Sequence, residues 1–381
     1  MPPDARPPTS PSTEPRLLCV STGGPNSLDA LRMRRLTEGL PYALEYFDVD
    51  KRSKKASAKA VWALVSERRP DLVYQEGAGI AAGLPLIRAA RAWGQPYVIS
   101  TGDPVGGFFR TVKGPLYGRM MDAYERALYR HSAGFIGWTP YLVGAALKLG
   151  APRAVTVEGA ADTAVFRPTD DAGRRAAKAD VGLNPDHLVL GVVGSLTWTP
   201  RQQYCYGLEL VEALPKMQRA DVSILIVGDG DGRAELERRV PEALRGRVVF
   251  TGRVPEDDVA RRMQAMDVGF ITQTLDGLGR FRLTTKLPEY LAAGVPVAMS
   301  PVPGFFDYAA EAGWPLPARH PGSAAFHAEL AAWADALAWA DVEEKRARAP
   351  AVAARYFAYP LVRAKFAAFL HHVLQETRRA A

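Results

Sequence analysis

Lys286 and Glu289 stand three residues apart at the start of an expected short helix, where they could hold two parts of one nucleotide. The backbone N–H groups and the dipole at a helix N-terminus favour a phosphate, and Lys286 adds a cationic contact. The carboxylate of Glu289 can accept two hydrogen bonds from a ribose diol. By local physics alone, the same residues fit equally well a capped helix whose glutamate complements the dipole.

The segment around these two residues has the features of a helix with defined ends. Thr284 or Thr285 can cap its start, and Pro288 is tolerated because a first-turn N–H has no intrahelical partner to lose. Gly294 suits the end of the helix, and Pro296 prevents its continuation. The sequence therefore predicts a short helix whose N-terminus projects from a strand edge.

Two series of short apolar stretches alternate with helical stretches along the chain. The expected strands of the first series are Arg16–Ser21, Ala43–Asp48, Asp71–Tyr74, Pro96–Ser100 and Gly134–Trp138, and the pattern breaks at Val155–Val157. Those of the second are His187–Val193, Val222–Val227, Val248–Phe250, Val268–Ile271 and Val295–Met299. Such alternation indicates parallel sheets covered on both faces. We therefore expect an α/β protein with two Rossmann-like domains facing each other across a cleft.

A polar, charged stretch that ends near Asp186 separates the two series. We expect an N-terminal domain over residues 16–168, a linker at 169–186, a C-terminal domain over 187–350 and a helical tail at 351–381. The tail pattern is interrupted at Pro360, and the tail could fold back across the cleft. Residues 1–15 are Pro/Ser/Thr-rich without a hydrophobic h-region, which predicts a disordered leader and not a signal peptide.

Composition argues against a disulfide-stabilised protein, a membrane-spanning protein and a nucleic-acid-binding protein. The two cysteines, Cys19 and Cys205, fit buried thiols in a reducing compartment, and no apolar stretch is long enough to span a bilayer, so we expect a cytoplasmic protein. The net charge is +7 and the densest basic cluster is at Lys51–Lys59. That cluster fits a solvated face, an anionic-acceptor patch or a peripheral contact with the inner face of a membrane. No nucleic-acid-binding motif accompanies it.

The segment Thr285–Gly294 resembles the donor-binding helix of GT-B glycosyltransferases, particularly the GT4-type retaining enzymes (glycosyl transferases group 1). Four other stretches resemble family motifs and follow in the family's order: Val157–Pro168, Val192–Leu196, Ile224–Gly230 and Val249–Pro255. The similarity covers roughly residues 16–375. The resemblance implies a GT-B fold and transfer of a sugar from a UDP- or GDP-sugar to a hydroxyl, with retention, in polysaccharide or glycoconjugate biosynthesis. The acceptor would be a glycan, a lipid-linked sugar or a small molecule.

The resemblance also assigns roles to individual residues. The donor site would comprise Gly194, Ser195, Arg201, Gly230, Arg253, Val254, Thr284, Thr285, Lys286, Leu287 and Glu289. The helix N-terminus at Thr285, Lys286 and Arg201 would stabilise the departing diphosphate, so no metal or other cofactor is required. Arg280 and Arg282 could supply further cations. Asp229-Gly230-Asp231 is then a turn near the nucleotide, although it could also be taken for a metal-binding DxD. The six histidines have no zinc-ligand spacing.

The acceptor side is expected in the N-terminal domain. Gly23 and Gly24 resemble the Gly-rich loop that faces the cleft, where glycine lets the backbone approach a ligand closely; a simple tight turn explains them equally well. Asp103 follows a strand end, where open α/β sheets bind ligands, so it could orient an acceptor hydroxyl or simply form a turn before Pro104.

The chain departs from the family at the sugar end of the donor site. Many proteins of the family carry two acidic residues eight positions apart. If Glu289 is the second of these acids, Phe281 stands where the first would be. Two other functions therefore stay open: a catalytically inactive GT-B partner protein that binds nucleotide-sugars, and a nucleotide-sugar epimerase. A nicotinamide oxidoreductase is disfavoured because Thr22–Asn26 lacks the G-x-G-x-x-G pattern.

Overall fold

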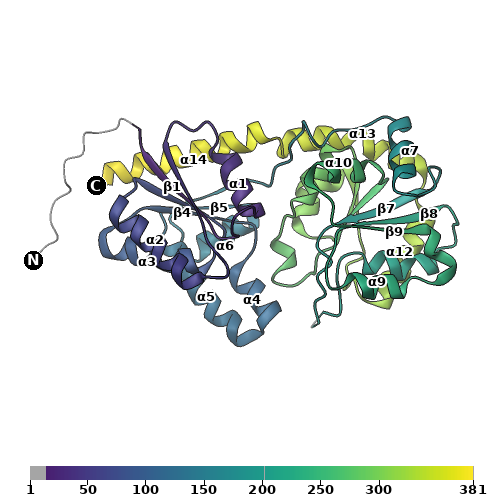
Figure 1. Ribbon diagram of the computed structural model, residues 1–381, viewed down its shortest axis with the longest axis horizontal. Coiled ribbons are helices and arrows are strands. Elements are labelled where there is room, and N and C mark those ends of the chain that lie inside the picture. Colours follow the sequence, from purple (N-terminus) through teal and green to yellow (C-terminus); the bar gives the residue numbers. More distant parts are fainter. Residues whose placement is uncertain (1–13, 201, 381) are drawn as a thin grey trace, which may run out of the picture.

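The computed structural model describes residues 14–200 and 202–380, so most of the predicted leader 1–15 and the candidate Arg201 lie outside the described residues. Each half of the molecule contains one parallel six-stranded sheet (Figure 1). Their strand orders are β2-β1-β3-β4-β5-β6 and β12-β11-β10-β7-β8-β9. The predicted fold class is confirmed.

In the described part of the N-terminal half, six strands alternate with helices, except that α5 follows α4 directly. The strands are β1 (Arg16–Ser21), β2 (Ala43–Asp48), β3 (Leu72–Glu76), β4 (Tyr97–Thr101), β5 (Gly134–Gly137) and β6 (Ala154–Thr156). The helices are α1 (Leu28–Thr37), α2 (Lys54–Arg68), α3 (Ile80–Trp93), α4 (Val105–Lys113), α5 (Pro115–Arg130) and α6 (Pro140–Lys148). Alternate residues of β1 enter opposite cores, Leu18 and Val20 on one face and Leu17 and Cys19 on the other, as a strand covered on both faces requires.

The C-terminal half repeats this architecture. Its strands are β7 (Leu188–Val193), β8 (Val222–Val227), β9 (Val248–Gly252), β10 (Val268–Ile271), β11 (Val297–Met299) and β12 (Gly313–Pro315). Its helices are α7 (Asp171–Asp180), α8 (Leu208–Ala213), α9 (Arg233–Arg239), α10 (Glu256–Gln264), α11 (Lys286–Ala292), α12 (Ala324–Ala336) and α13 (Trp339–Tyr356). Shorter helical turns cover Leu214–Lys216, Glu242–Arg247, Gly279–Phe281, Phe305–Ala309 and Ala310–Ala312. The pattern did not reveal β6 or β12, because these short strands at the sheet edges, unlike β11, are not continuous buried apolar runs.

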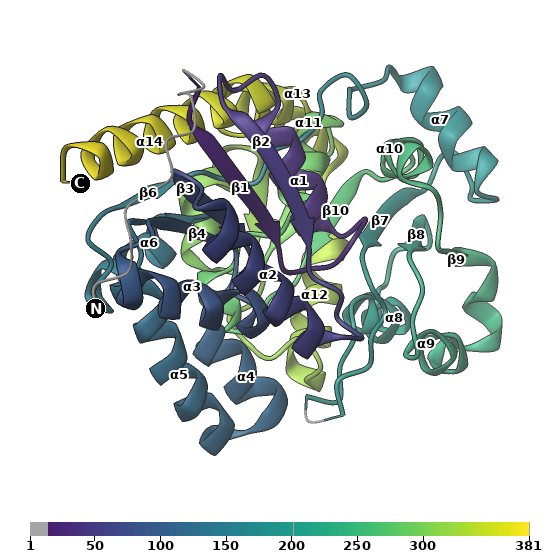
Figure 2. The same cartoon turned by 60° about the vertical axis from the view of Figure 1, so that its left-hand side comes forward.

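The last helix, α14 (Tyr359–Ala380), lies against the N-terminal half although it follows the C-terminal domain (Figures 1 and 2). Its buried residues, Phe366 among them, join the core cluster beneath the N-terminal sheet, and the rings of Phe366 and Tyr74 meet edge to face at 4.8 Å between centroids. Pro360 is in the first turn, where its missing N–H costs no intrahelical bond. The preceding α13 begins at Trp339, twelve residues before the start we predict for the tail.

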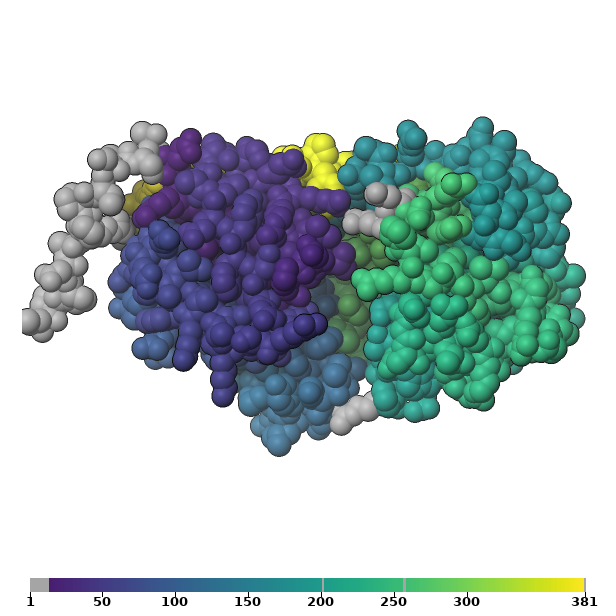
Figure 3. Space-filling view, in the orientation of Figure 1, coloured from purple at the N-terminus to yellow at the C-terminus, as the bar shows by residue number. Residues whose placement is uncertain are grey.

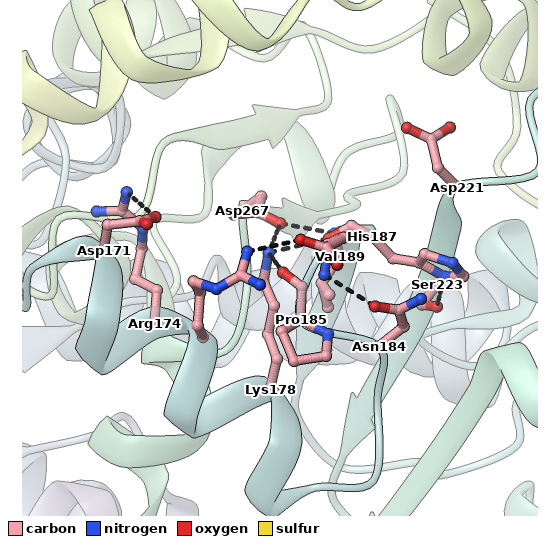
Figure 4. A network of polar contacts seen from close by, with 12 residues as sticks. Asp171, Arg174, Lys178, Asn184, Pro185, His187, Val189, Asp221, Ser223 and Asp267 are labelled. Carbon is pink, nitrogen blue, oxygen red and sulfur yellow. Dashed lines mark hydrogen bonds and ion pairs between the residues drawn. The ribbon is translucent and has the colours of Figure 1, made fainter.

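Helix α7 occupies most of the stretch predicted as a linker, and a buried ion pair attaches it to the C-terminal sheet (Figure 4). Lys178 Nζ lies 2.7 Å from Asp267 Oδ2, and Arg346 of α13 lies 2.9 Å from Asp267 Oδ1. The carboxylate also accepts the Val189 N–H at 2.8 Å. The Asp267 side chain is only 1% exposed, so two cations and one backbone amide depend on it.

None of the described helices is both long and apolar enough to cross a membrane.

We expect Asp267→Ala to lower the free energy of unfolding by about 3–5 kcal/mol, because it leaves the buried ammonium of Lys178 without a counter-charge and Arg346 with one acidic partner fewer. Urea denaturation would measure the loss. The matched control is Asp186→Ala, which removes an aspartate that is 72% exposed and paired with Arg175. Its effect on stability should be much smaller, because a solvent-exposed ion pair contributes little. Equal losses in the two variants would contradict a structural role for the buried network.

Candidate functional site

A cleft of about 510 Å³ lies between the two halves (Figure 3). Its lining comes from the carboxyl ends of strands and from the loops that follow them in both sheets, where parallel α/β sheets bind ligands. Thr22, Glu76 and Asp103 follow or end strands of the N-terminal sheet, and Gly194 and Gln273 follow strands of the C-terminal sheet.

A second hollow of about 710 Å³ continues from the cleft into the C-terminal half. It is lined by Gly230, Arg253 and Val254, and it shares Gly194, Ser195 and Lys286 with the cleft. The structure therefore brings together most residues predicted for the donor. The backbone is tightly packed here: a Cβ on Gly230 would lie 2.5 Å from the backbone carbon of Leu196, so only glycine fits.

Helix α11 is anchored beside this hollow by its own buried face. Tyr290 is fully buried, and its hydroxyl accepts the backbone N–H of Val193 at 2.9 Å. Thr284, and not Thr285, contacts the first turn through its side chain: its Oγ1 accepts the Lys286 N–H at 3.3 Å. Gly294 follows the helix in the left-handed conformation, at φ +74°. The N-terminus of α11 thus opens onto the cleft.

Three predicted donor residues have surroundings that the sequence could not show. Thr285 lines the cleft, whereas Leu287 is fully buried and Glu289 lines neither hollow. Glu289 Oε2 lies 2.6 Å from Lys286 Nζ, which makes the two residues an ion pair along the helix. Lys286 itself lines both hollows. Of the pair, Lys286 is therefore the side chain that borders both spaces.

Asp103 meets a partner from the other half of the molecule. Its Oδ1 lies 2.6 Å from Nε of Arg282, which precedes α11, and Tyr206 also hydrogen-bonds to Arg282. All three residues line the cleft. Arg282, which the sequence suggested only as one of several further cations for a diphosphate, therefore places a cation between the acceptor side and the donor side.

Two further carboxylates of the cleft, Asp29 and Glu76, were missed by the sequence analysis. Glu76 ends β3, is 1% exposed, and accepts hydrogen bonds from Ser100 Oγ at 3.0 Å and from the Tyr74 hydroxyl. Asp29 lies in the first turn of α1; burial, and then the negative charge of Glu76, raise its pKa to about 7. Their positions in the sequence could have pointed to the cleft, because Glu76 closely follows a predicted strand and Asp29 follows the Gly23-Gly24 loop.

The two loop glycines support the cleft without lining it. A Cβ on Gly23 would lie 2.8 Å from the Asp29 carboxylate and closer still to Ser27, so glycine leaves room for that carboxylate. Gly24 has φ +97°, which favours glycine. Among the neighbouring residues Thr22 does line the cleft.

Phe281, at the position where the family often has an acid, joins the two halves instead. Its backbone carbonyl accepts a hydrogen bond from Thr139 Oγ1 at 3.1 Å, and its ring packs against the core of the N-terminal half. This position therefore contributes apolar contact between the halves and no charge.

The acids of the Asp229–Asp231 turn bind backbone groups. Asp229 Oδ1 accepts the N–H of Gly230 at 2.9 Å, and Asp231 Oδ1 accepts that of Trp198 at 2.7 Å. Throughout the described parts of the chain, no three His, Cys, Asp or Glu side chains gather in a way that could hold a metal ion.

The raised pKa of Asp29 gives a test that needs no ligand. The folded protein keeps this proton up to about pH 7, whereas the unfolded chain loses it near pH 4, so ionisation destabilises the fold as pH rises between these values. Compared with the wild type, Asp29→Asn should therefore become more stable from pH 4 to pH 7, by at most about 4 kcal/mol, and the gain should be constant above pH 7.

Urea denaturation across this pH range would measure the difference. Asp171→Asn is the matched control, because Asp171 is also in the first turn of a helix but is 75% exposed. A gain for Asp29→Asn that does not change with pH would contradict the assignment.

Comparisons with known proteins agree with this geometry. Residues 187–337 match the family model "glycosyl transferases group 1", and residues 12–158 match "glycosyl transferase 4-like domain". A 2-deoxystreptamine glucosyltransferase of Streptomyces kanamyceticus is 35% identical over 120 residues, which are 31% of this chain and 29% of that protein. The matched part is thus less than a third of that relative.

Solved structures share the fold at low identity. The Anabaena protein HepE in complex with UDP and glucose has a TM-score of 0.71 at 16% identity, over 94% of this chain and 100% of HepE. Sucrose-phosphate synthase of Thermosynechococcus elongatus has a TM-score of 0.71 at 17% identity, over 96% and 100% of the two chains. With both halves matched in the order of its two sheets, this chain belongs to the GT4-type family of GT-B-fold glycosyltransferases.

Proposed function

We propose that this protein transfers a sugar from a nucleotide-diphosphate-sugar to a hydroxyl group of an acceptor. The observation that carries the proposal is the cleft itself: cations and hydroxyls at the start of α11 lie on one wall, and carboxylates of the N-terminal half lie on the other. The adjoining hollow at Gly230, Arg253 and Val254 has room for a nucleotide.

A UDP-sugar is the first donor to test. HepE has been solved with UDP and with UDP-glucose, and the Streptomyces relative is named a glucosyltransferase, which supports UDP-glucose over a GDP-sugar. The departing diphosphate would be stabilised by Arg282, Lys286 and the first backbone N–H groups of α11. Arg201 is kept as a further proposed cation. We propose that the reaction retains the anomeric configuration and requires no metal, as the family resemblance implies.

The acceptor proposed first is a small, polyhydroxylated molecule that carries positive charge. Among the described residues that line the N-terminal wall, the charged side chains are Asp29, Glu76 and Asp103, and all three are carboxylates. Glu76 is paired with the buried Arg32 at 3.6 Å, and Asp103 is paired with Arg282. An ammonium group would therefore be attracted mainly to the Asp103 carboxylate, once a diphosphate has replaced that carboxylate beside Arg282. The relative named for 2-deoxystreptamine supports this choice. Glycan and lipid-linked acceptors are the alternatives to compare with it.

One assay separates transfer from the two other functions. The protein would be incubated with UDP-, GDP- and dTDP-sugars, with and without 2-deoxystreptamine, while bound nucleotide, released nucleotide and sugar products are measured. Acceptor-dependent release of nucleotide with a new glycoside supports transfer. A changed sugar still attached to its nucleotide would indicate an epimerase, and binding with no turnover under any condition would indicate an inactive partner protein.

Glu289→Ala should weaken nucleotide-sugar binding by about 1–3 kcal/mol if Glu289 holds the ribose, because the ribose hydroxyls then lose their acceptor. Titration calorimetry with UDP and with UDP-glucose would measure the affinity. Glu311→Ala is the control: Glu311 belongs to the same half, is 55% exposed and pairs with Arg355. An unchanged affinity for UDP in Glu289→Ala would remove Glu289 from the site.

Arg282→Gln should weaken UDP-glucose binding by about 1.5–3 kcal/mol, since it removes a charge-assisted contact to the diphosphate. Arg280→Gln is a close control: Arg280 is exposed two residues earlier, and its guanidinium donates to the backbone carbonyls of Asp276 and Leu275. The same calorimetry measures both variants. Similar losses in both would show that general charge, and not Arg282, attracts the donor.

A further inference from the structure

The helical hairpin formed by α4 and α5 exposes large apolar side chains. Phe108, Val112, Leu116 and Met120 are 36%, 45%, 83% and 55% exposed. Exposures this high are uncommon for a leucine or a methionine in a soluble domain, and four in thirteen consecutive residues form a local concentration. The hairpin projects from the edge of the N-terminal half in Figures 1 and 2.

The spacing places these side chains in pairs on exposed helix faces. Phe108 and Val112 are four residues apart on α4, and Leu116 and Met120 are four apart on α5, so each pair shares one face of its helix. Gly114, with φ +97°, makes the turn between the helices. The tip of the hairpin thus presents Val112, Leu116 and Met120, whereas Phe108 lies one turn further back along α4 and lines the cleft.

The hairpin is held firmly, so its exposure is not a consequence of loose packing. The carboxylate of Glu125 on α5 accepts the first two N–H groups of α4, from Val105 at 3.0 Å and Gly106 at 3.1 Å. Met121 and Leu128 of α5 are buried. The inner face of the hairpin therefore packs against the domain, and its outer apolar face is what is left for a partner.

Positive charge surrounds the exposed apolar residues. Lys113, Arg119 and Arg126 are exposed, and within the described residues they form no ion pair. Arg110 pairs with Asp122. Apolar side chains flanked by lysine and arginine complement an anionic bilayer surface, where the chains enter the interface and the cations meet lipid phosphates.

We propose that the tip of the α4–α5 hairpin docks this protein onto an anionic lipid surface. The basic cluster at Lys51–Lys59, which the sequence suggested for such a contact, is exposed at the start of α2 but contains no large apolar residue. The hairpin has both exposed apolar side chains and exposed cations. Because Phe108 and Phe109 at the base of the hairpin also line the cleft, docking would bring the cleft close to the lipid surface. The proposal does not depend on the transfer reaction.

Cosedimentation of the full chain with vesicles tests the proposal. One set of vesicles contains equal parts of phosphatidylcholine and phosphatidylglycerol, and the other contains phosphatidylcholine alone. We expect preferential binding to the anionic vesicles and at least about tenfold weaker binding by the double variants Leu116→Ser/Met120→Ser and Lys113→Glu/Arg119→Glu. Neither pair lines the cleft, so UDP-glucose binding should be unchanged and shows that the variants are folded.

Two controls locate the surface. Lys54→Glu/Lys55→Glu makes the same charge change on α2, and Leu147→Ser removes a leucine that is 47% exposed on α6; both should bind vesicles like the wild type. Three outcomes would overturn the proposal. The wild type could fail to bind vesicles, the hairpin variants could bind them as well as the wild type does, or binding could be lost only in the α2 variant. Sedimentation velocity without lipid adds one more overturning outcome: dimers that dissociate in Leu116→Ser/Met120→Ser would make the hairpin an interface between copies of the chain.

Discussion

The carboxyl ends of two parallel sheets face a single cleft, and every functional assignment in this protein depends on that constraint. Parallel strands leave their last residues at one edge, so side chains distant in the sequence meet there. Glu76 ends β3, Asp103 follows β4 and Gly194 follows β7, yet all three line the same space. The sheets thus fix where the loops lie, and residues at the strand ends and in the loops line the cleft.

Glu158 connects the elements that hold this arrangement together. Its carboxylate accepts hydrogen bonds from Tyr308 of the C-terminal half and from Lys365 of α14, and it is only 5% exposed. The backbone carbonyl of the same residue accepts a hydrogen bond from Arg32 of α1. Glu158 thus contacts both halves and the returning helix, and it contributes to holding them together.

Sequence patterns were informative wherever the relevant physics is local. Periodicity located ten of the strands, because buried parallel strands are continuous apolar runs, and the ends of α11 followed from Thr284, Pro288 and Gly294. The sequence pattern could not show which side chains pair with one another in the fold. A three-residue spacing could not show whether Glu289 would face a ribose or pair with Lys286, and the contact of Asp103 with Arg282 joins residues 179 positions apart. Phe281 appeared as a missing acid, whereas in three dimensions it is a contact between the halves.

The pair of Asp103 and Arg282 has a consequence for how a donor would enter the cleft. Arg282 already has an anion beside it, so a diphosphate that binds there replaces one counter-ion with another. The diphosphate would bring one negative charge more than the carboxylate it replaces, and Lys286 on the same wall of the cleft would balance it. Asp103 would be released as the phosphate takes its place. The carboxylate would then become available on the acceptor wall after the donor is bound, which gives the two substrates an order of arrival.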